Sequence, residues 1–342
     1  MSSISVNTIT DASGGATTSI NGFTPSVSNM AGRNRIINGD MRISQRGDYT
    51  SPVSASNNGY YLDRWVASIG AVTATVQQTN VVINGVSKTA QKIAATSSGT
   101  GYIGLGQRVE LINLQDGETY TVSCWVRSNN ANTSFRTTLS GGFADTSVFT
   151  NDGNWEKVST TITLNKAALT YITVSLNTYQ NGAVAVASGD YIEFTEFQLE
   201  EGSVATPFEH RQYGQELALC QRYCQVVYRS LGSNSLGMSF KQGSNYLLTH
   251  ITYQPMRSIP TWANPPTSWD TTGSPSSTQA GAYDFTSSSL VTINGGSLSV
   301  INQLSLNHGR LYLQSSTTFS GGSGGGAFGT SLGADPILTA EL

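Results

Sequence analysis

The feature that most constrains the fold is a repeated alternation of apolar and polar residues in short segments. "WEKVSTTITL" (155–164) and "YIEFTEFQLE" (191–200) alternate with a period of two, and turns containing Asn, Asp or Gly separate such segments. A strand with this period turns one set of side chains toward a core. After the Asp-Gly turn of "LQDGETYTVSCWV", the residues predicted to share one face are Tyr120, Val122, Cys124 and Val126.

Composition and charge agree with a turn-rich all-β protein and narrow its function. Only 11% of the 342 residues are charged, the formal net charge is −3, and 36 residues are Gly. There is no run of Lys and Arg and no apolar stretch long enough for a bilayer, so we expect neither nucleic-acid binding nor membrane insertion. Three cysteines are too few for a disulfide framework, and we expect buried thiols.

The chain is predicted to contain four parts. Residues 1–34 are polar and lack sustained periodicity, which predicts an extended arm. Residues 35–207 are predicted to form a jelly-roll β-sandwich, and 208–229 a linker with a short helix. Residues 230–342 return to Ser/Thr/Gly-rich strands and predict a second, smaller β-sandwich domain.

Six charged residues lie between Gln198 and Cys224, a stretch that leads into the linker. A helix is expected from Gln215 to about Val227, and we interpret Glu209, Arg211 and Glu216 as surface and capping charges. Four residues at helical spacing are expected to form one stripe along this helix: Leu217, Cys220, Cys224 and Val227. The stripe would face either another subunit or the protein's own sheet, and both alternatives stay open.

Two motifs bracket the first domain, "RIINGDMRISQRG" (35–47) and "YIEFTEFQLEEG" (191–202). They resemble the first and last strands of jelly-roll carbohydrate-binding modules, in which a structural calcium is commonly held between these strands. The resemblance implies Asp40 and Glu196 as calcium ligands, although Phe194 and Thr195 replace the first part of the acidic pair. A calcium site and no metal at all are the two alternatives, and we expect no cofactor.

The order of several motifs is more specific. A polar arm, the jelly-roll motifs, "QLEEGSVATPFEHRQYGQELALCQRYC" and a terminal "AEL" together resemble a family of bacteriophage virion proteins, often described as tail fibres. The resemblance implies a homo-oligomer, with a trimer expected, that assembles in the host cytoplasm and resides in the virion. Residues 1–34 would bind other tail or virion proteins, and the distal β domain would bind a host cell-surface glycan. A capsid-decorating or collar protein with a purely structural role is the alternative.

No converging catalytic groups are evident, and we predict that the protein is not an enzyme. Sugar recognition uses aromatic rings beside hydrogen-bonding groups. The segment "PTWANPPTSWD" (260–270) predicts an exposed tryptophan loop, with a role in pinning the loop or in a subunit interface as the alternative. The candidate receptor-binding residues are Trp262, Asn264, Trp269 and Asp270, with Tyr253 and Tyr283 as weaker candidates.

Overall fold

The structure is a computed structural model, in which the chain divides into two compact units, Met1–Glu216 and Leu217–Leu342. No helix in the described part of the chain is long and apolar enough to cross a membrane. The residues that the structure describes are 32–139, 142–146, 150–167, 169–179, 182–226, 234–242, 246–263, 268–269, 279–284, 289–290, 298–306, 308–315, 327–332 and 337–342.

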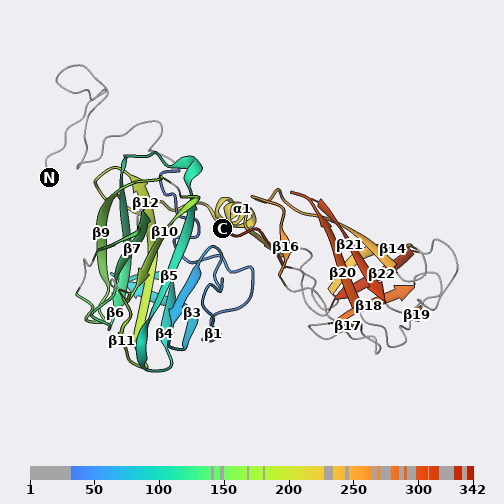
Figure 1. Ribbon diagram of the computed structural model, residues 1–342, viewed down its shortest axis with the longest axis horizontal. Helices are drawn as coiled ribbons and strands as arrows, with labels where there is room; N and C mark the ends of the chain where they lie inside the picture. The colour runs from blue at the N-terminus through green and yellow to red at the C-terminus, as the bar shows by residue number, and fades with distance from the viewer. Residues whose placement is uncertain are drawn as a thin grey trace, which may run out of the picture. The chain divides into compact units, whose positions relative to one another are not determined.

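The first unit is a sandwich of two antiparallel sheets, each with six strands (Figure 1). In the first sheet the strand order is β1 (Val53–Ala55), β3 (Ala74–Ile83), β4 (Val86–Ala95), β12 (Tyr191–Glu201), β6 (Thr119–Ser128) and β9 (Glu156–Thr163). In the second sheet the order is β11 (Val184–Val186), β5 (Gly99–Glu110), β10 (Tyr171–Asn177), β7 (Ser134–Leu139) and β8 (Gly142–Thr146), with β2 (Val66–Gly70) also paired to β5. A short 3-10 helix, Leu111–Asn113, follows β5.

The core lies between these sheets. The predicted inward face of β6 is confirmed, since all four of its side chains are at most 1% exposed. Trp65 packs edge-on against Phe194 and Phe197, with ring centroids 4.9 and 5.3 Å apart. Each such buried apolar side chain contributes roughly 1.5–3 kcal/mol. Burial also raises the pKa of the Cys124 thiol well above its ordinary value, as expected for a cysteine that serves as a small core residue.

The second unit contains two further sheets. The smaller has the order β13 (Cys224–Val226), β23 (Ile337–Thr339) and β16 (Thr261–Trp262). The larger has the order β17 (Ser268–Trp269), β18 (Gln279–Asp284), β22 (Ala327–Leu332), β14 (Asn234–Gln242), β15 (Tyr246–Thr252), β21 (His308–Ser315) and β20 (Leu298–Leu304), with β19 (Ser289–Leu290) beside β18. The predicted all-β fold class with one short helix is therefore confirmed.

Helix α1 is shorter than the sequence predicts. It spans Tyr213–Gln221, and the expected continuation to Val227 is wrong, since Cys224 lies on β13, paired with Thr339. Strand pairing overrides the helical spacing here because the residues after Gln221 are rich in strand-forming types. Leu217 is half-buried and Cys220 and Cys224 are buried, but they do not form one helical stripe. Val227 lies outside the described residues.

Candidate functional site

The outward face of the second sheet carries a groove with a volume of about 530 Å³. It crosses β2, β5, β10 and β7 and extends to the residues just after β10. The aromatic, cationic and amide side chains that line it are Asn58, Tyr102, Arg108, Arg136, Tyr171, Asn177 and Tyr179. They combine ring surfaces with hydrogen-bond donors and acceptors in a single concave surface.

Strand alternation explains why these side chains point outward. On β5, Ile103 and Leu105 are fully buried in the core, so Tyr102 and Arg108 lie on the opposite face. On β10 the core positions are Ile172, Val174 and Leu176, and the alternating positions that line the groove are Tyr171, Thr173, Ser175 and Asn177. The core of the sandwich thus fixes which residues face the groove.

Two glycines, Gly104 and Gly106, lie between Tyr102 and Arg108 on β5, and Gly106 lines the groove. A Cβ atom at Gly104 would lie 2.3 Å from the Cβ of Asn177, and one at Gly106 would lie 2.6 Å from the Cβ of Ser175. Both distances are shorter than any side chain tolerates. The close approach of β5 and β10 therefore requires glycine at both positions, and the floor of the groove stays free of bulky side chains.

Guanidinium groups lie over two of the tyrosine rings. The Arg108 guanidinium carbon is 5.2 Å from the ring centroid of Tyr171, and that of Arg136 is 4.4 Å from the ring centroid of Tyr179. Such cation–π contacts contribute roughly 0.5–1 kcal/mol at exposed sites. Arg136 Nη1 also donates to the Tyr179 carbonyl at 3.0 Å, and Tyr102 meets Tyr179 edge-to-face at 5.2 Å. These contacts hold the rings and the cations in position before any ligand arrives.

A chain of polar groups runs along the bottom of the groove. The Asn177 amide donates to Ser175 Oγ at 3.2 Å, and Ser175 Oγ donates to the Arg136 carbonyl at 3.2 Å. Asn177 Oδ1 accepts the Tyr179 backbone N–H at 2.9 Å. Both side chains are nearly buried, with 4% exposure for Asn177 and 6% for Ser175. A hydroxyl-rich ligand would therefore meet oriented hydrogen-bonding groups at the floor.

The two carboxylates predicted as calcium ligands do lie near each other, in a second cavity of about 250 Å³. Asp40 is paired with Arg42 at 2.5 Å, and Glu196 is paired with Lys88. Calcium takes six to eight oxygen ligands, and no cluster of three or more acidic, His or Cys side chains suited to a metal occurs among the described residues. Because a cation already neutralises each carboxylate, this donor set does not fit calcium.

The predicted receptor-binding residues have different surroundings from those expected. Trp262 is only 7% exposed and lies on β16, paired with Leu338, so the prediction that it is exposed on a loop is wrong. Strand pairing and apolar burial outweigh the loop signal of the neighbouring prolines. The Tyr253 hydroxyl donates to the carbonyls of Ser305 at 2.7 Å and His308 at 3.1 Å.

The other candidates in this part of the chain remain predictions. Trp269 lies on β17 and Tyr283 on β18. Asn264 and Asp270 lie outside the described residues. A receptor-binding role for any of these residues, Trp262 and Tyr253 included, is untested by the fold.

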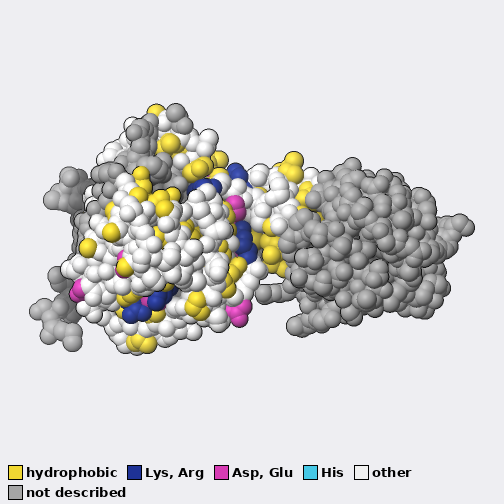
Figure 2. All heavy atoms as spheres, turned by 60° about the horizontal axis from the view of Figure 1, so that its bottom comes forward, with side chains coloured by type: hydrophobic (Ala, Val, Ile, Leu, Met, Phe, Trp, Pro, Cys, Tyr) yellow, Lys and Arg dark blue, Asp and Glu magenta, His cyan; other side chains and the backbone are white. Residues whose placement is uncertain are grey.

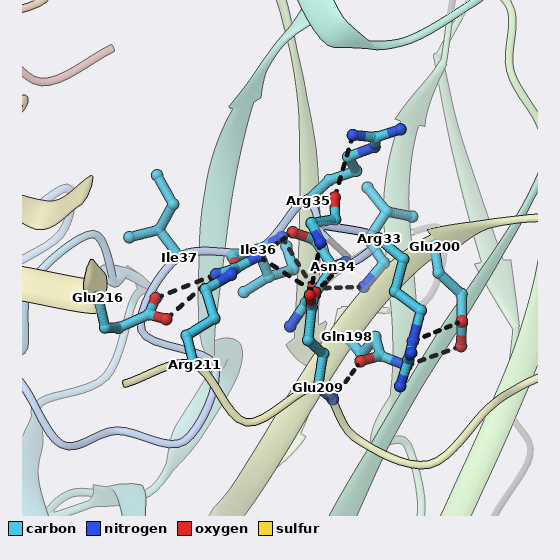
Figure 3. A network of polar contacts seen from close by, with 12 residues as sticks. Arg33, Asn34, Arg35, Ile36, Ile37, Gln198, Glu200, Glu209, Arg211 and Glu216 are labelled. Atoms are coloured by element: carbon cyan, nitrogen blue, oxygen red, sulfur yellow. Dashed lines mark hydrogen bonds and ion pairs between the residues drawn. The ribbon is translucent and has the colours of Figure 1, made fainter. Parts of the chain in front are cut away.

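The charged linker forms a buried network, so the interpretation of its charges as surface features is wrong, while Glu216 does lie in the first turn of α1 as expected. The Glu209 carboxylate accepts the backbone N–H groups of Gly32 at 2.6 Å and Asn34 at 2.8 Å. Figure 3 shows Arg211 between the Glu216 carboxylate and the backbone of residues 34–36. Glu216 is 4% exposed and the Arg211 side chain 7%.

This junction network consists of segment 32–38 and segment 198–216. Segment 32–38 contributes no strand to either sheet, so its backbone groups need other partners once they are buried. Carboxylates and a guanidinium supply them, which explains why charge is concentrated in this part of a chain that is otherwise poor in charge.

The groove lies in the part of the chain that resembles a known family. Residues 56–181 match the profile of a family described as "Carbohydrate binding domain", and this part of the chain therefore resembles such a domain. All the described residues that line the groove, from Asn58 to Tyr179, fall within this range.

Solved structures of low sequence identity also align with the chain. The carbohydrate-binding module TmCBM61 in complex with β-1,4-galactotriose is 16% identical, with coverage of 50% of this chain and 99% of that one and a TM-score of 0.29. A CBM4 structure is 18% identical over 48% and 98% of the two chains, with a TM-score of 0.31. The enzymatically active domain of bacteriophage CBA120 tailspike protein 4 is 12% identical over 50% of this chain and 22% of its own, with a TM-score of 0.32. At these scores the alignments indicate no function for this chain, and no curated protein matches it.

The groove residues were not predicted from the sequence. A usable signal exists in "GYIGLGQRV", where Tyr102 and Arg108 alternate with the core residues of β5. The same signal recurs in "YITVSLNTY", where aromatic and polar residues occupy every second position from Tyr171 to Tyr179. Reading the outward positions of a predicted strand, and not only its inward ones, would have found both.

Proposed function

We propose that the protein binds a glycan in the groove of the second sheet and does so without catalysis. The observation that carries this proposal is the position of the groove, which lies wholly within the part of the chain that matches a carbohydrate-binding domain. Proteins recognise sugars with side chains of the kinds found here. Tyrosine rings pack against sugar rings, and amide and guanidinium groups form hydrogen bonds with sugar hydroxyls.

The chemistry of the lining supports binding over hydrolysis. Glycoside hydrolysis commonly uses a pair of carboxyl groups that flank the scissile bond. The described residues that line the groove include no Asp, Glu, His or Cys. The groove therefore offers hydrogen bonds and ring surfaces but lacks the usual acid and base.

We extend the proposal to a virion protein of the tail-fibre type. The order of the arm, the bracketing strands, the charged linker and the final "AEL" supports this assignment. In this proposal residues 1–34 attach a homotrimer to other virion proteins, and the glycan belongs to the host surface. The position of the protein in an image of the whole particle tests the assignment, because a location over the capsid lattice would favour a decorating protein.

The test of glycan binding uses the full chain and a panel of immobilised neutral and acidic polysaccharides. We expect retention on at least one member, and Tyr171→Ala should abolish it because the substitution removes a ring from the groove wall. Tyr191→Ala is the matched control, since Tyr191 lies in the first sheet with Lys92 4.5 Å from its ring centroid. Equal loss in both variants, or retention on no polysaccharide, would contradict the proposal.

A further inference from the structure

We propose that the groove selects glycans that carry anionic groups, such as carboxylates or sulfates, on more than one sugar residue. This inference rests on the proposed glycan binding and specifies the class of ligand. Its basis is the sign, the placement and the spacing of the charges in the groove.

The charge of the groove differs in sign from that of the chain. Arg108 and Arg136 are the charged side chains among the described residues that line it. The whole chain has 21 acidic and 18 basic residues, so a cationic groove is a local feature and not a consequence of overall composition. On the described face drawn in Figure 2, uncharged side chains and backbone cover most of the surface, and Lys and Arg gather in small clusters. No carboxylate occurs among the described residues that line the groove, so an anionic ligand would meet no repulsive charge from them.

The stacking geometry favours anion recognition over stacking of neutral sugars. A neutral sugar ring binds an aromatic platform by packing its C–H groups on the ring face. Here the guanidinium groups already lie over one face of Tyr171 and one face of Tyr179, at 5.2 and 4.4 Å from the centroids. These rings therefore hold the guanidinium planes in place. A fixed guanidinium presents a fork of N–H donors that matches a carboxylate or sulfate.

The spacing of the two cations indicates a ligand with several charges. Arg136 on β7 is the register partner of Ser175 on β10, which in turn is the partner of Gly106 on β5, two residues before Arg108. Two strand spacings and two residues along a strand place the Cα atoms of the arginines about 12 Å apart. Their guanidinium groups diverge from there, that of Arg108 toward Tyr171 and that of Arg136 toward Tyr179, so the two cations lie no closer together than the Cα atoms. This distance exceeds a single pyranose ring, so one ligand reaches both arginines only with anionic groups on different sugar residues.

The floor between the cations complements the rest of such a ligand. Ser175 and Asn177 lie between Arg136 and β5, and the glycines of β5 leave the floor low. The uncharged hydroxyls of an acidic glycan would bond to these groups while its anions meet the guanidinium groups. We therefore assign the arginines to ligand selection and the floor to general sugar recognition.

The test compares four immobilised probes with the full chain: polygalacturonate, dextran sulfate, and the neutral polysaccharides galactan and xylan. We expect binding to one or both acidic probes at least about tenfold tighter than to the neutral ones, and weakening as salt rises. Preference between the two acidic probes distinguishes a carboxylate ligand from a sulfate ligand.

Two variants with the same substitution locate the effect. Thr173→Glu places a carboxylate in the groove beside Arg108, its register partner, and should weaken acidic-probe binding about tenfold or more through charge repulsion. Thr161→Glu makes the same change at an exposed position of β9 in the first sheet and should leave binding within about twofold. Arg108→Gln, which keeps hydrogen-bonding capacity without the charge, should weaken binding even if Thr173→Glu fails to fold.

The outcomes separate this inference from the proposed function. Equal or tighter binding of the neutral probes, with loss in Tyr171→Ala, would overturn the anionic preference and leave glycan binding standing. Binding to none of the probes would overturn both. If Thr173→Glu and Thr161→Glu weakened binding of the acidic probes equally, the probes would be attracted by the charge of the whole surface and not by the groove. That result would also overturn the inference.

Discussion

The junction network and the groove both gather charged side chains in a chain that has few of them, yet they use the charges in opposite ways. At the junction, Glu209, Arg211 and Glu216 bond to one another and to the backbone of segment 32–38. In the groove, Arg108 and Arg136 lie half-buried on the outward face of a sheet. A local concentration of charge therefore serves structure at the junction, whereas we propose that the two separated arginines on the concave face serve recognition.

The largest loss of stability on substitution is expected at the junction network. Arg211→Ala would leave the buried Glu216 carboxylate without its ion pair and remove the donor to the Ile36 carbonyl. We expect the free energy of unfolding to fall by about 3–5 kcal/mol, as measured by urea denaturation. The matched control is Arg35→Ala, since Arg35 pairs with the half-exposed Glu201 at 3.9 Å. This substitution should lower the free energy of unfolding by no more than about 1 kcal/mol. Similar losses in the two variants would remove the distinction between the buried ion pair of Arg211 and the partly exposed ion pair of Arg35.

A smaller effect is expected at the groove floor. Gly104→Ala places a Cβ atom 2.3 Å from that of Asn177 and 2.8 Å from the Leu176 carbonyl, which forces β5 and β10 apart. We expect a loss of about 1–3 kcal/mol in the free energy of unfolding, together with weaker glycan binding. Gly214→Ala is the control, since no heavy atom would lie within 4 Å of its added Cβ and alanine favours the helix. Unchanged stability in Gly104→Ala would contradict the role given to the glycine floor.

The smallest effect is expected at the cavity that contains Asp40 and Glu196. Because Arg42 and Lys88 neutralise these carboxylates, adding millimolar calcium or a chelator should leave the Tm unchanged. Differential scanning calorimetry in the two conditions makes the measurement. A calcium-dependent rise of several degrees would show a metal site and would restore the role that the resemblance implies for these two residues.

Part of this architecture could be predicted from the sequence because its signal is local. β6 alternates cleanly after an Asp-Gly turn, and its inward face was predicted residue by residue. β5 gives a weaker signal, since Gly99, Gly101, Gly104 and Gly106 lower strand propensity while the fold needs them for close packing.

The other differences arise from long-range pairing. The end of α1 depends on the pairing of Cys224 with Thr339, more than a hundred residues away in the chain, and no local pattern encodes it. The burial of Trp262 depends on the same distant strand. The groove also required two segments, β5 and β10, to be brought together, so its residue types could be read from the sequence but their convergence could not.

The most direct test of the central claim is hydrogen–deuterium exchange of the full chain, with and without the polysaccharide that the panel retains. We expect slower exchange in peptides covering β5 and residues 171–179, and unchanged exchange in β9 and in segment 32–38. Protection confined to β9 or to the segment around Trp262, with β5 and β10 unchanged, would contradict this claim.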